Sequence, residues 1–238
     1  LYHLASSNTT TPEKIMGLFG SFTLEISDTG DGTLLVPIKG VEMRFVEVEP
    51  LYFRQVDGPF AIVFREDEHG RITHMFTDVM PQYALVKLNW YESPGFHMAL
   101  LLVCILVFLS MLPVAAIGAF PNRRLGSDRK PDSRGARVAY RIILGICLLN
   151  LLFLVGVALK FPPTQPSELH GIVLTTTIAM GLGVLAAVLT VGALVYAILA
   201  WRNGYWGVAF RTYYTLVTIA AVAFVWFLHF WNWLGWRY

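Results

Sequence analysis

The sequence predicts an α+β membrane protein, in which a small antiparallel β domain, a meander or barrel, precedes a bundle of four transmembrane helices. One observation is charge: residues 1–95 hold 13 acidic and 7 basic residues, whereas the rest of the chain holds 3 acidic and 11 basic residues. Another is composition, because the 238 residues are 55% hydrophobic with a mean hydropathy of +0.57, more apolar than an ordinary soluble domain. We therefore expect a linker at 1–16, an extracytoplasmic β domain at 17–95 and transmembrane helices within 96–238.

The β domain is predicted from about six short runs that alternate in polarity and end in Gly, Asp or Pro, the pattern of an antiparallel meander. Asp57-Gly58 stands between two apolar runs and favours a hairpin. A sheet of this kind closes its edges by curling. The expected core comprises Phe22, Leu24, Leu35, Phe45, Phe53, Phe64 and Met75.

Four apolar runs are long enough to cross a bilayer, which takes about 20 residues of helix. They lie at about 97–120, 138–159, 172–200 and 212–234. Both cysteines, Cys104 and Cys147, fall within these runs and are expected to act as small hydrophobic residues.

The loops between the runs predict the orientation. The first loop, "PNRRLGSDRKPDSRGAR", and the third, "WRNGYWGVAFR", are basic, whereas the second, "KFPPTQPSELHG", has only Lys160. The positive-inside rule then places the first and third loops in the cytoplasm and both ends of the chain outside it. Six of the seven tryptophans fall at the ends of the runs, where indoles favour the interface, and only Trp226 lies deeper.

Catalytic and metal-binding patterns are weak. The single S-x-x-K, Ser127 to Lys130, lies in a charged loop before Pro131, on the expected cytoplasmic side. The six histidines show no H-x-H or H-x-x-x-H spacing, and there is no C-x-x-C. We therefore assign no catalytic, cofactor-binding or metal-binding residue.

The remaining polar residues have structural interpretations. Glu66, Asp67 and Glu68 are expected in a solvated turn, and Glu47 and Glu49 on the wet face of a strand. The expected spans contain no Asp or Glu, whereas ion pathways usually carry ionisable groups. Asn150 and His229 are expected to serve packing, with a polar path as the alternative, and "GLGVLAAV" from Gly181 offers small residues for close helix contact.

Several strings resemble the C-terminal region of a bacterial membrane-bound serine hydrolase family, in the clan of class C beta-lactamases and penicillin-binding proteins. They are "NTTTPEKIMGLFGSFTLEISDTGDGTLLV", "FVEVEPLYFRQVDG", "AIVFREDEHGRITHMF" and the ending "YYTLVTIAAVAFVWFLHFWNWLGWRY". The resemblance implies an exported catalytic domain upstream, carrying S-x-x-K, Y-x-N and H-x-G or K-T-G. The last three motifs are absent here, and the one S-x-x-K is on the wrong side of the membrane, so no catalytic residue is carried over.

Two functions remain open. One is a non-catalytic anchor and accessory β module of such a hydrolase, at the outer face of the bacterial cytoplasmic membrane. Its partners are then the lipid bilayer and the upstream catalytic domain, and the chain, which begins at Leu1, is a fragment or a processed product. The alternative is a free-standing four-span sensor or transporter accessory whose β domain binds a ligand or a partner. Neither involves nucleic acid or a cofactor.

Overall fold

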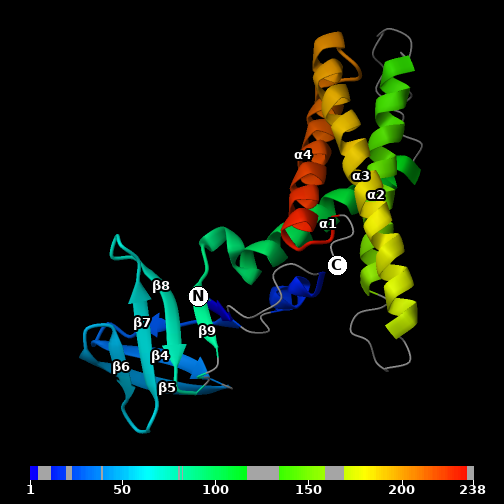
Figure 1. The fold of residues 1–238 in the computed structure, drawn as a ribbon. Helices are drawn as coiled ribbons and strands as arrows, with labels where there is room; N and C mark the ends of the chain where they lie inside the picture. Colours follow the sequence, from blue (N-terminus) through cyan, green and yellow to red (C-terminus); the bar gives the residue numbers. More distant parts are fainter. Residues whose placement is uncertain are drawn as a thin grey trace. The chain divides into compact units, whose positions relative to one another are not determined.

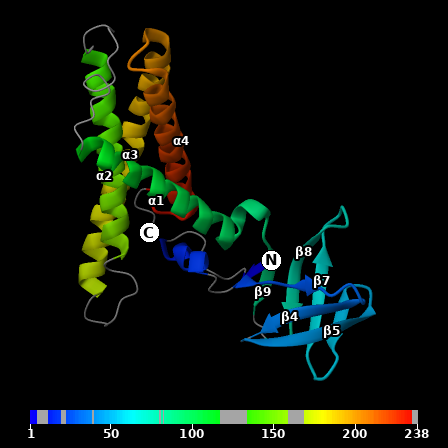
Figure 2. The ribbon, with the colours of Figure 1, turned by 180° about the vertical axis from the view of Figure 1, so that it is seen from behind.

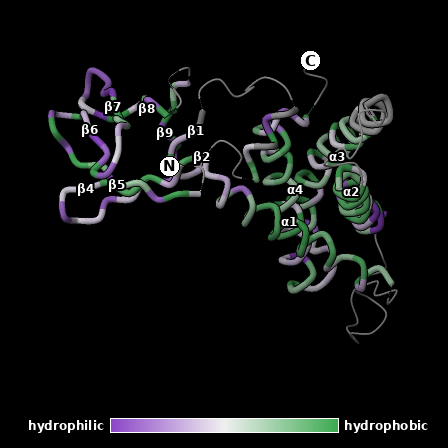
Figure 3. Tube along the Cα trace, turned by 90° about the horizontal axis from the view of Figure 1, so that it is seen from below, coloured by the Kyte–Doolittle hydropathy of each residue, from purple (hydrophilic) through white to green (hydrophobic). Residues whose placement is uncertain are grey.

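We analysed a computed structural model, which describes residues 1–4, 12–19, 23–38, 40–79, 81, 83–116, 134–158 and 169–234. The chain divides into two compact units, Leu1–Met98 and Ala99–Tyr238. This boundary lies close to the one expected from charge and hydropathy. Along the tube in Figure 3, hydrophilic and hydrophobic residues alternate in the first unit, whereas the helices of the second are mainly hydrophobic.

The first unit is a curled antiparallel sheet (Figure 1). Its order is β2-β1-β9-β8-β7-β6-β5-β4-β3. Seven strands have three residues or more, and they are β1 (Tyr2–Leu4), β4 (Thr33–Ile38), β5 (Val41–Glu49), β6 (Tyr52–Gln55), β7 (Ala61–Glu66), β8 (Ile72–Thr77) and β9 (Ala84–Lys87). The other two, β2 (Thr23–Leu24) and β3 (Ser27–Asp28), are two-residue strands. Two 3-10 helices, η1 (Pro12–Phe19) and η2 (Trp90–Glu92), complete the unit.

The segment 23–28 explains how the sheet curls. Its first part, β2, pairs with β1, and its last part, β3, pairs with β4, although β1 and β4 lie near opposite ends of the strand order. Only two residues separate β2 from β3. One short segment therefore bridges both edges of the sheet, which covers edge groups that would otherwise pair with another chain.

The β core forms where one face of each strand points inward. Its buried members are Tyr2, Val36, Phe45, Ile62, Phe64, Met75 and Leu85, with Leu24 and Phe53 packed against them. Phe45, Phe64 and Met75 are thus buried as expected, and Leu24 and Phe53 are partly buried. Leu35 is a correction, because Leu34 and Val36 take the inward positions of β4. Phe22 lies outside the described residues.

The first residues of the chain also differ from expectation. We expected a linker at 1–16, but Tyr2–Leu4 forms β1, which pairs with both β9 and β2. Tyr2 is 6% exposed, and its ring lies 5.8 Å from that of Phe64. This segment therefore belongs to the sheet and to its core.

The second unit contains four helices among its described residues: α1 (Pro94–Ala116), whose first turn belongs to the β unit, α2 (Arg134–Ala158), α3 (Leu169–Asn203) and α4 (Val208–Phe230). All four are long and apolar enough to cross a membrane. In Figures 1 and 2, α2, α3 and α4 lie side by side, and α1 runs obliquely across them. The chain thus has the α+β membrane fold that the sequence predicts.

A seam of small residues allows α3 to pack closely. Its buried positions recur at alternating spacings of four and three: Ala179, Gly183, Ala186, Thr190, Ala193, Ala197 and Ala200. A Cβ added at Gly183 would lie 3.3 Å from Leu228 of α4. Small side chains let helix backbones approach closely in lipid, where dispersion contacts replace the hydrophobic effect between helices.

The contacts of α1 with α4 are polar as well as apolar. The Ser110 Oγ and Tyr213 Oη atoms lie 2.8 Å apart, and the Cys104 Sγ donates to the Ala220 carbonyl at 3.5 Å. The Phe108 and Phe224 rings pack edge to face, with centroids 5.6 Å apart. These contacts hold α1 to the bundle through α4.

Candidate functional site

The segment that leads from β9 into α1 is the strongest candidate for a functional site in the β unit, because here the chain enters its first apolar helix. The Asn89 backbone N–H and its Nδ2 each donate to the Glu92 Oε2 at 2.9 Å. The Ser93 Oγ donates to the Trp90 carbonyl at 2.8 Å and accepts from the Phe96 N–H at 3.3 Å. Ser93 therefore satisfies an amide of the first turn of α1, as an N-cap does.

This segment carries several aromatic side chains. Trp90 is 74% exposed, and its ring packs edge to face against Tyr91 and Phe96, with centroids 5.9 and 5.2 Å away. Indole and phenol rings favour the boundary between water and lipid, since one part is apolar and another is polar. The segment is suited to contact with a membrane interface.

Lys14 of η1 interacts electrostatically with Glu92 of η2, in the segment that leads from β9 into α1. Burial lowers the pKa of the Lys14 ammonium, and the carboxylate of Glu92 in η2 acts in the opposite direction. A half-buried ammonium near a carboxylate loses hydration but gains a partner of opposite charge. His97, in the first turn of α1, is fully buried.

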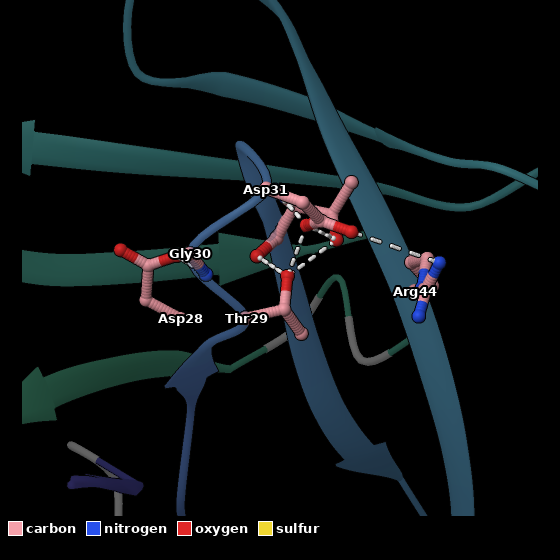
Figure 4. A network of polar contacts seen from close by, with 6 residues as sticks. Asp28, Thr29, Gly30, Asp31 and Arg44 are labelled. Atoms are coloured by element: carbon pink, nitrogen blue, oxygen red, sulfur yellow. Dashed lines mark hydrogen bonds and ion pairs between the residues drawn. The ribbon is translucent and has the colours of Figure 1, made fainter.

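The turn between β3 and β4 contains a network of hydroxyl and carboxylate groups (Figure 4). The Asp31 Oδ1 accepts hydrogen bonds from the Thr29 hydroxyl, from the Thr33 hydroxyl at 2.6 Å and from the Thr33 N–H at 3.1 Å. The Arg44 guanidinium lies 3.9 Å from the Asp31 Oδ2. These hydrogen bonds, that of Thr29 above all, lower the pKa of Asp31 to about 2. The carboxylate thus stabilises its own turn.

The acidic run 66–68 was expected in a turn, but Glu66 is the last residue of β7 and pairs with Ile72 of β8, so the turn begins at Asp67. Glu66 and Glu68 are both exposed. The Asp67 Oδ1 accepts from the His69 N–H at 2.9 Å and from the Arg71 N–H at 3.0 Å, and the Oδ2 accepts from the Arg71 Nε at 3.0 Å. The hydrogen bond from the Arg71 amide is the main reason that the pKa of Asp67 is lowered. Glu47 also serves a turn, because its Oε1 accepts from the Leu51 N–H at 3.0 Å.

The other residues considered for chemistry do not come together. Ser127 and Lys130 lie outside the described residues. His69 is in a turn, and His74 stacks on Phe76 in β8. Among the described residues, no three His, Cys, Asp or Glu side chains form a group that could hold a metal ion. Asn150 is buried in α2, whereas His229 is exposed in the last turn of α4.

The indoles at the helix ends are of two kinds. Trp90 and Trp201 are exposed at 74% and 47%, as side chains at an interface are. Trp206, Trp231 and Trp233 are buried within the helical unit, and the Trp233 ring packs edge to face on Phe153 at 5.7 Å. Sequence position alone did not separate the two kinds.

The class of protein defined by these observations is an α+β membrane protein, with a curled β sheet and four apolar helices that fit a multi-pass arrangement. Comparisons with protein families, with curated proteins and with solved structures find no match.

Proposed function

We propose that this chain is a non-catalytic membrane anchor and accessory β module of a beta-lactamase-related serine hydrolase, held at the outer face of the bacterial cytoplasmic membrane. The observation that supports the membrane anchor is the abrupt change from a charged to an apolar sequence after β9. Residues 1–95 hold 13 of the 16 acidic residues of the chain, whereas the 23 residues of α1 contain no Asp, Glu, Lys or Arg.

The surface of the helical unit supports an anchoring role. Its exposed side chains include long runs of large aliphatic residues, among them Leu102, Leu106, Leu152, Val188, Val191 and Ile198. A surface of this size and polarity is unfavourable in water and favourable in hydrocarbon. We infer that lipid solvates it.

The charge of the helical unit supports the orientation. Five arginines lie at the start of α2, the end of α3 and the start of α4. Basic residues remain on the cytoplasmic side when helices insert. With α1, α2 and α3 crossing in turn, the β unit is then extracytoplasmic.

The mechanism of the anchor is physical. An enzyme confined to the membrane surface meets membrane-bound substrates at a higher effective concentration than a free enzyme does. The link to a serine hydrolase rests on the sequence resemblance described above. It predicts an open reading frame upstream of the codon for Leu1 that encodes S-x-x-K followed by Y-x-N. A start codon and a signal sequence directly upstream would instead favour the free-standing sensor.

The orientation is tested by labelling single cysteines in spheroplasts with a membrane-impermeant maleimide. Val56, in the β6–β7 turn, is 50% exposed, and Arg202 is exposed at the end of α3. We expect Val56→Cys to react in intact spheroplasts and Arg202→Cys to react only after lysis. Cys104 and Cys147 are buried, so the unmodified chain serves as the control. The reverse labelling pattern would mean that the topology is inverted, and it would contradict the proposal.

A fluorescent probe that reacts with serine nucleophiles tests the non-catalytic assignment. We expect no labelling of membranes that contain this chain alone. A labelled band that disappears in Ser127→Ala would make Ser127 a nucleophile and contradict the assignment.

A further inference from the structure

The first and last strands of the β unit place its two chain ends together. β1 and β9 run antiparallel, with Tyr2 opposite Lys87. The Leu88 N–H donates to the Leu1 carbonyl at 3.0 Å, which continues the pairing past the last residue of β9. The start of β1 therefore lies beside the end of β9, as the N-terminus in Figure 1 does. We call this end of the sheet, which holds Leu1 and Leu88, the entry end.

β1 is fixed within the sheet. It pairs with β9 on one side and with β2 on the other. Tyr2 is buried, and its ring lies beside that of Phe64 in the core. Residues that precede Leu1 would therefore join the β unit at a defined place and not through a loose edge.

The entry end also leads into the first apolar helix. Only five residues, 89–93, separate Leu88 from Pro94, the first residue of α1. An extended chain covers at most about 3.6 Å per residue, and paired strands lie about 5 Å apart, so Leu1 lies within about 27 Å of the start of α1. Because Trp90–Glu92 coil into η2, the true separation is shorter than this limit.

Exposed side chains in this passage suit a boundary between water and lipid. Trp90 and Tyr91 in η2 are 74% and 42% exposed, and Met98 in α1 is 40% exposed. These side chains are continuous along the chain with the exposed apolar surface of α1, to which Leu102 belongs. Indole and phenol rings favour the interface, so a membrane that takes up α1 would have its headgroups close to η2.

The β6–β7 turn lies at the opposite end of the sheet. Because neighbouring strands are antiparallel, β8 begins and β7 ends at the end where β9 finishes. The β7–β8 turn is therefore at the entry end, whereas β7 begins, and β6 finishes, at the far end. The six residues of β7 span about 20 Å.

We propose that the β unit turns its entry end toward the bilayer and holds the domain that precedes Leu1 against the lipid headgroups. A domain joined at the far end would stand about 20 Å farther from the membrane. The hydrolase proposed above then acts on lipid-linked substrates, whose reacting group lies near the headgroups, and not on soluble ones. This substrate class rests on the proposed function, whereas the placement of Leu1 does not.

Distances to the membrane surface test the placement. The full chain is inserted in phosphatidylcholine vesicles that contain a lipid with a fluorescent acceptor on its headgroup, and single cysteines carry the donor dye. Leu1→Cys and the exposed His69→Cys, in the β7–β8 turn, report on the entry end, and Val56→Cys reports on the far end. Cys104 and Cys147 are buried, so the unmodified chain gives the background.

We expect the labels at Leu1 and His69 to lie about 10–20 Å nearer the membrane surface than the label at Val56. His69 keeps the comparison valid if Leu1→Cys disturbs β1. A label at Val56 that lies as near as the one at His69, or nearer, would overturn the proposal.

The complete reading frame tests the substrate class. A phosphonate probe that reacts with serine nucleophiles is attached to phosphatidylethanolamine through a short or a long spacer. We expect the membrane-bound enzyme to react with the short-spacer probe at least as fast as with the long-spacer probe. Reaction with the long-spacer and soluble probes alone would place the active site far from the headgroups and contradict the proposal. A missing upstream frame, or no reaction with any probe, would contradict the proposed function and leave the measured distances intact, so the two failures are distinguishable.

Discussion

Phe45 illustrates how burial determines how much a single residue contributes to the stability of the β unit. It is fully buried at the centre of the core, whereas its neighbour Val46 is 37% exposed on the outer face. We expect Phe45→Ala to lower the free energy of unfolding of the β unit by about 3–5 kcal/mol, because it leaves a cavity. Val46→Ala should change it by about 0.5 kcal/mol or less. Urea unfolding of the full chain, followed by amide exchange in β5 and β7, measures both changes, and similar values would contradict the inward direction of Phe45.

β4 shows where the sequence could not decide between two faces. Leu34, Leu35 and Val36 are consecutive apolar residues, so alternation gave no choice between odd and even positions. Pairing with β5 decides it, since Leu34 lies opposite the buried Phe45, and Val36 lies opposite Met43. In β5 itself, Phe45 stands between Arg44 and Val46, and the charge beside it made the inward residue predictable.

Asp31 gives a prediction for pH. Its pKa is lowered from 3.8 to about 2, chiefly by the hydroxyl of Thr29. A carboxyl with a lowered pKa in the folded state contributes stability that is present above the unfolded value and is lost as the pH falls through the folded value. The β3–β4 turn should therefore weaken between pH 4 and 2, as Asp31 takes up a proton.

The measurement is a carboxyl carbon NMR titration of Asp31, with an expected midpoint near 2. Thr29→Val removes the main donor and should move the midpoint toward 3.8. Thr73→Val, whose hydroxyl donates to the Arg65 carbonyl in another hairpin, is the control and should leave the midpoint unchanged. A midpoint that stays the same in both variants would show that Thr29 is not the cause.

At the scale of elements, the helices and the longer strands were predictable, but the short strands β1 and β9 were not. The helices were expected from unbroken apolar runs, and their ends differ from the expected ones by a few residues. β1 has three residues and β9 four, too few for alternation to be recognised. Their strand state depends on pairing between residues more than 80 positions apart, such as Tyr2 with Lys87, which no local pattern contains.

The seam of α3 was predictable only in part. The glycines and alanines from Gly181 indicated close packing, and Gly183 makes such an approach, whereas a Cβ at Gly181 would meet nothing within 4 Å. The seven-residue repeat continues beyond that string to Ala200. A repeat with spacings of four and three keeps one face of a helix toward its neighbours.

Ala193 tests this seam. It is fully buried, and its carbonyl accepts from the Tyr214 hydroxyl of α4 at 3.4 Å. We expect Ala193→Leu to overpack the contact and to destabilise the bundle by about 1–3 kcal/mol. Val195→Phe adds bulk at a position that is 52% exposed on the same helix and should be tolerated. The temperature of aggregation in detergent compares the two, and equal behaviour would mean that α3 packs less tightly than described.

At the scale of the whole molecule, the division into a water-soluble and a lipid-soluble part followed from composition alone. Charges are expelled from hydrocarbon and apolar runs from water, so the two kinds of residue separate along the chain. The candidate sites were less predictable. Arg134, Arg202 and Arg211 belong to three different helices, and the sequence indicated only that they lie in or beside loops. The contact of Gly135 with Tyr205, 70 residues away, needed the fold.

Whether lipid or water surrounds each unit is tested by replacing one exposed valine of each unit with arginine. Val191, in the middle of α3, is 63% exposed, and Val63, on the outer face of β7, is 40% exposed. If lipid surrounds the helices, Val191→Arg costs about 2.5–3.5 kcal/mol of insertion, because a guanidinium loses its hydration at the bilayer centre. Val63→Arg should cost little, since water reaches that face.

Extraction of membranes with alkaline carbonate measures the difference. We expect the unmodified chain and Val63→Arg to stay in the pellet, and Val191→Arg to be released or degraded in part. Val191→Leu, which keeps the position apolar, should behave like the unmodified chain. Because Val191 is the more exposed of the two valines, a water-soluble helical bundle would tolerate arginine there at least as well as at Val63. Equal retention of the two arginine variants would therefore mean that α3 does not lie in hydrocarbon.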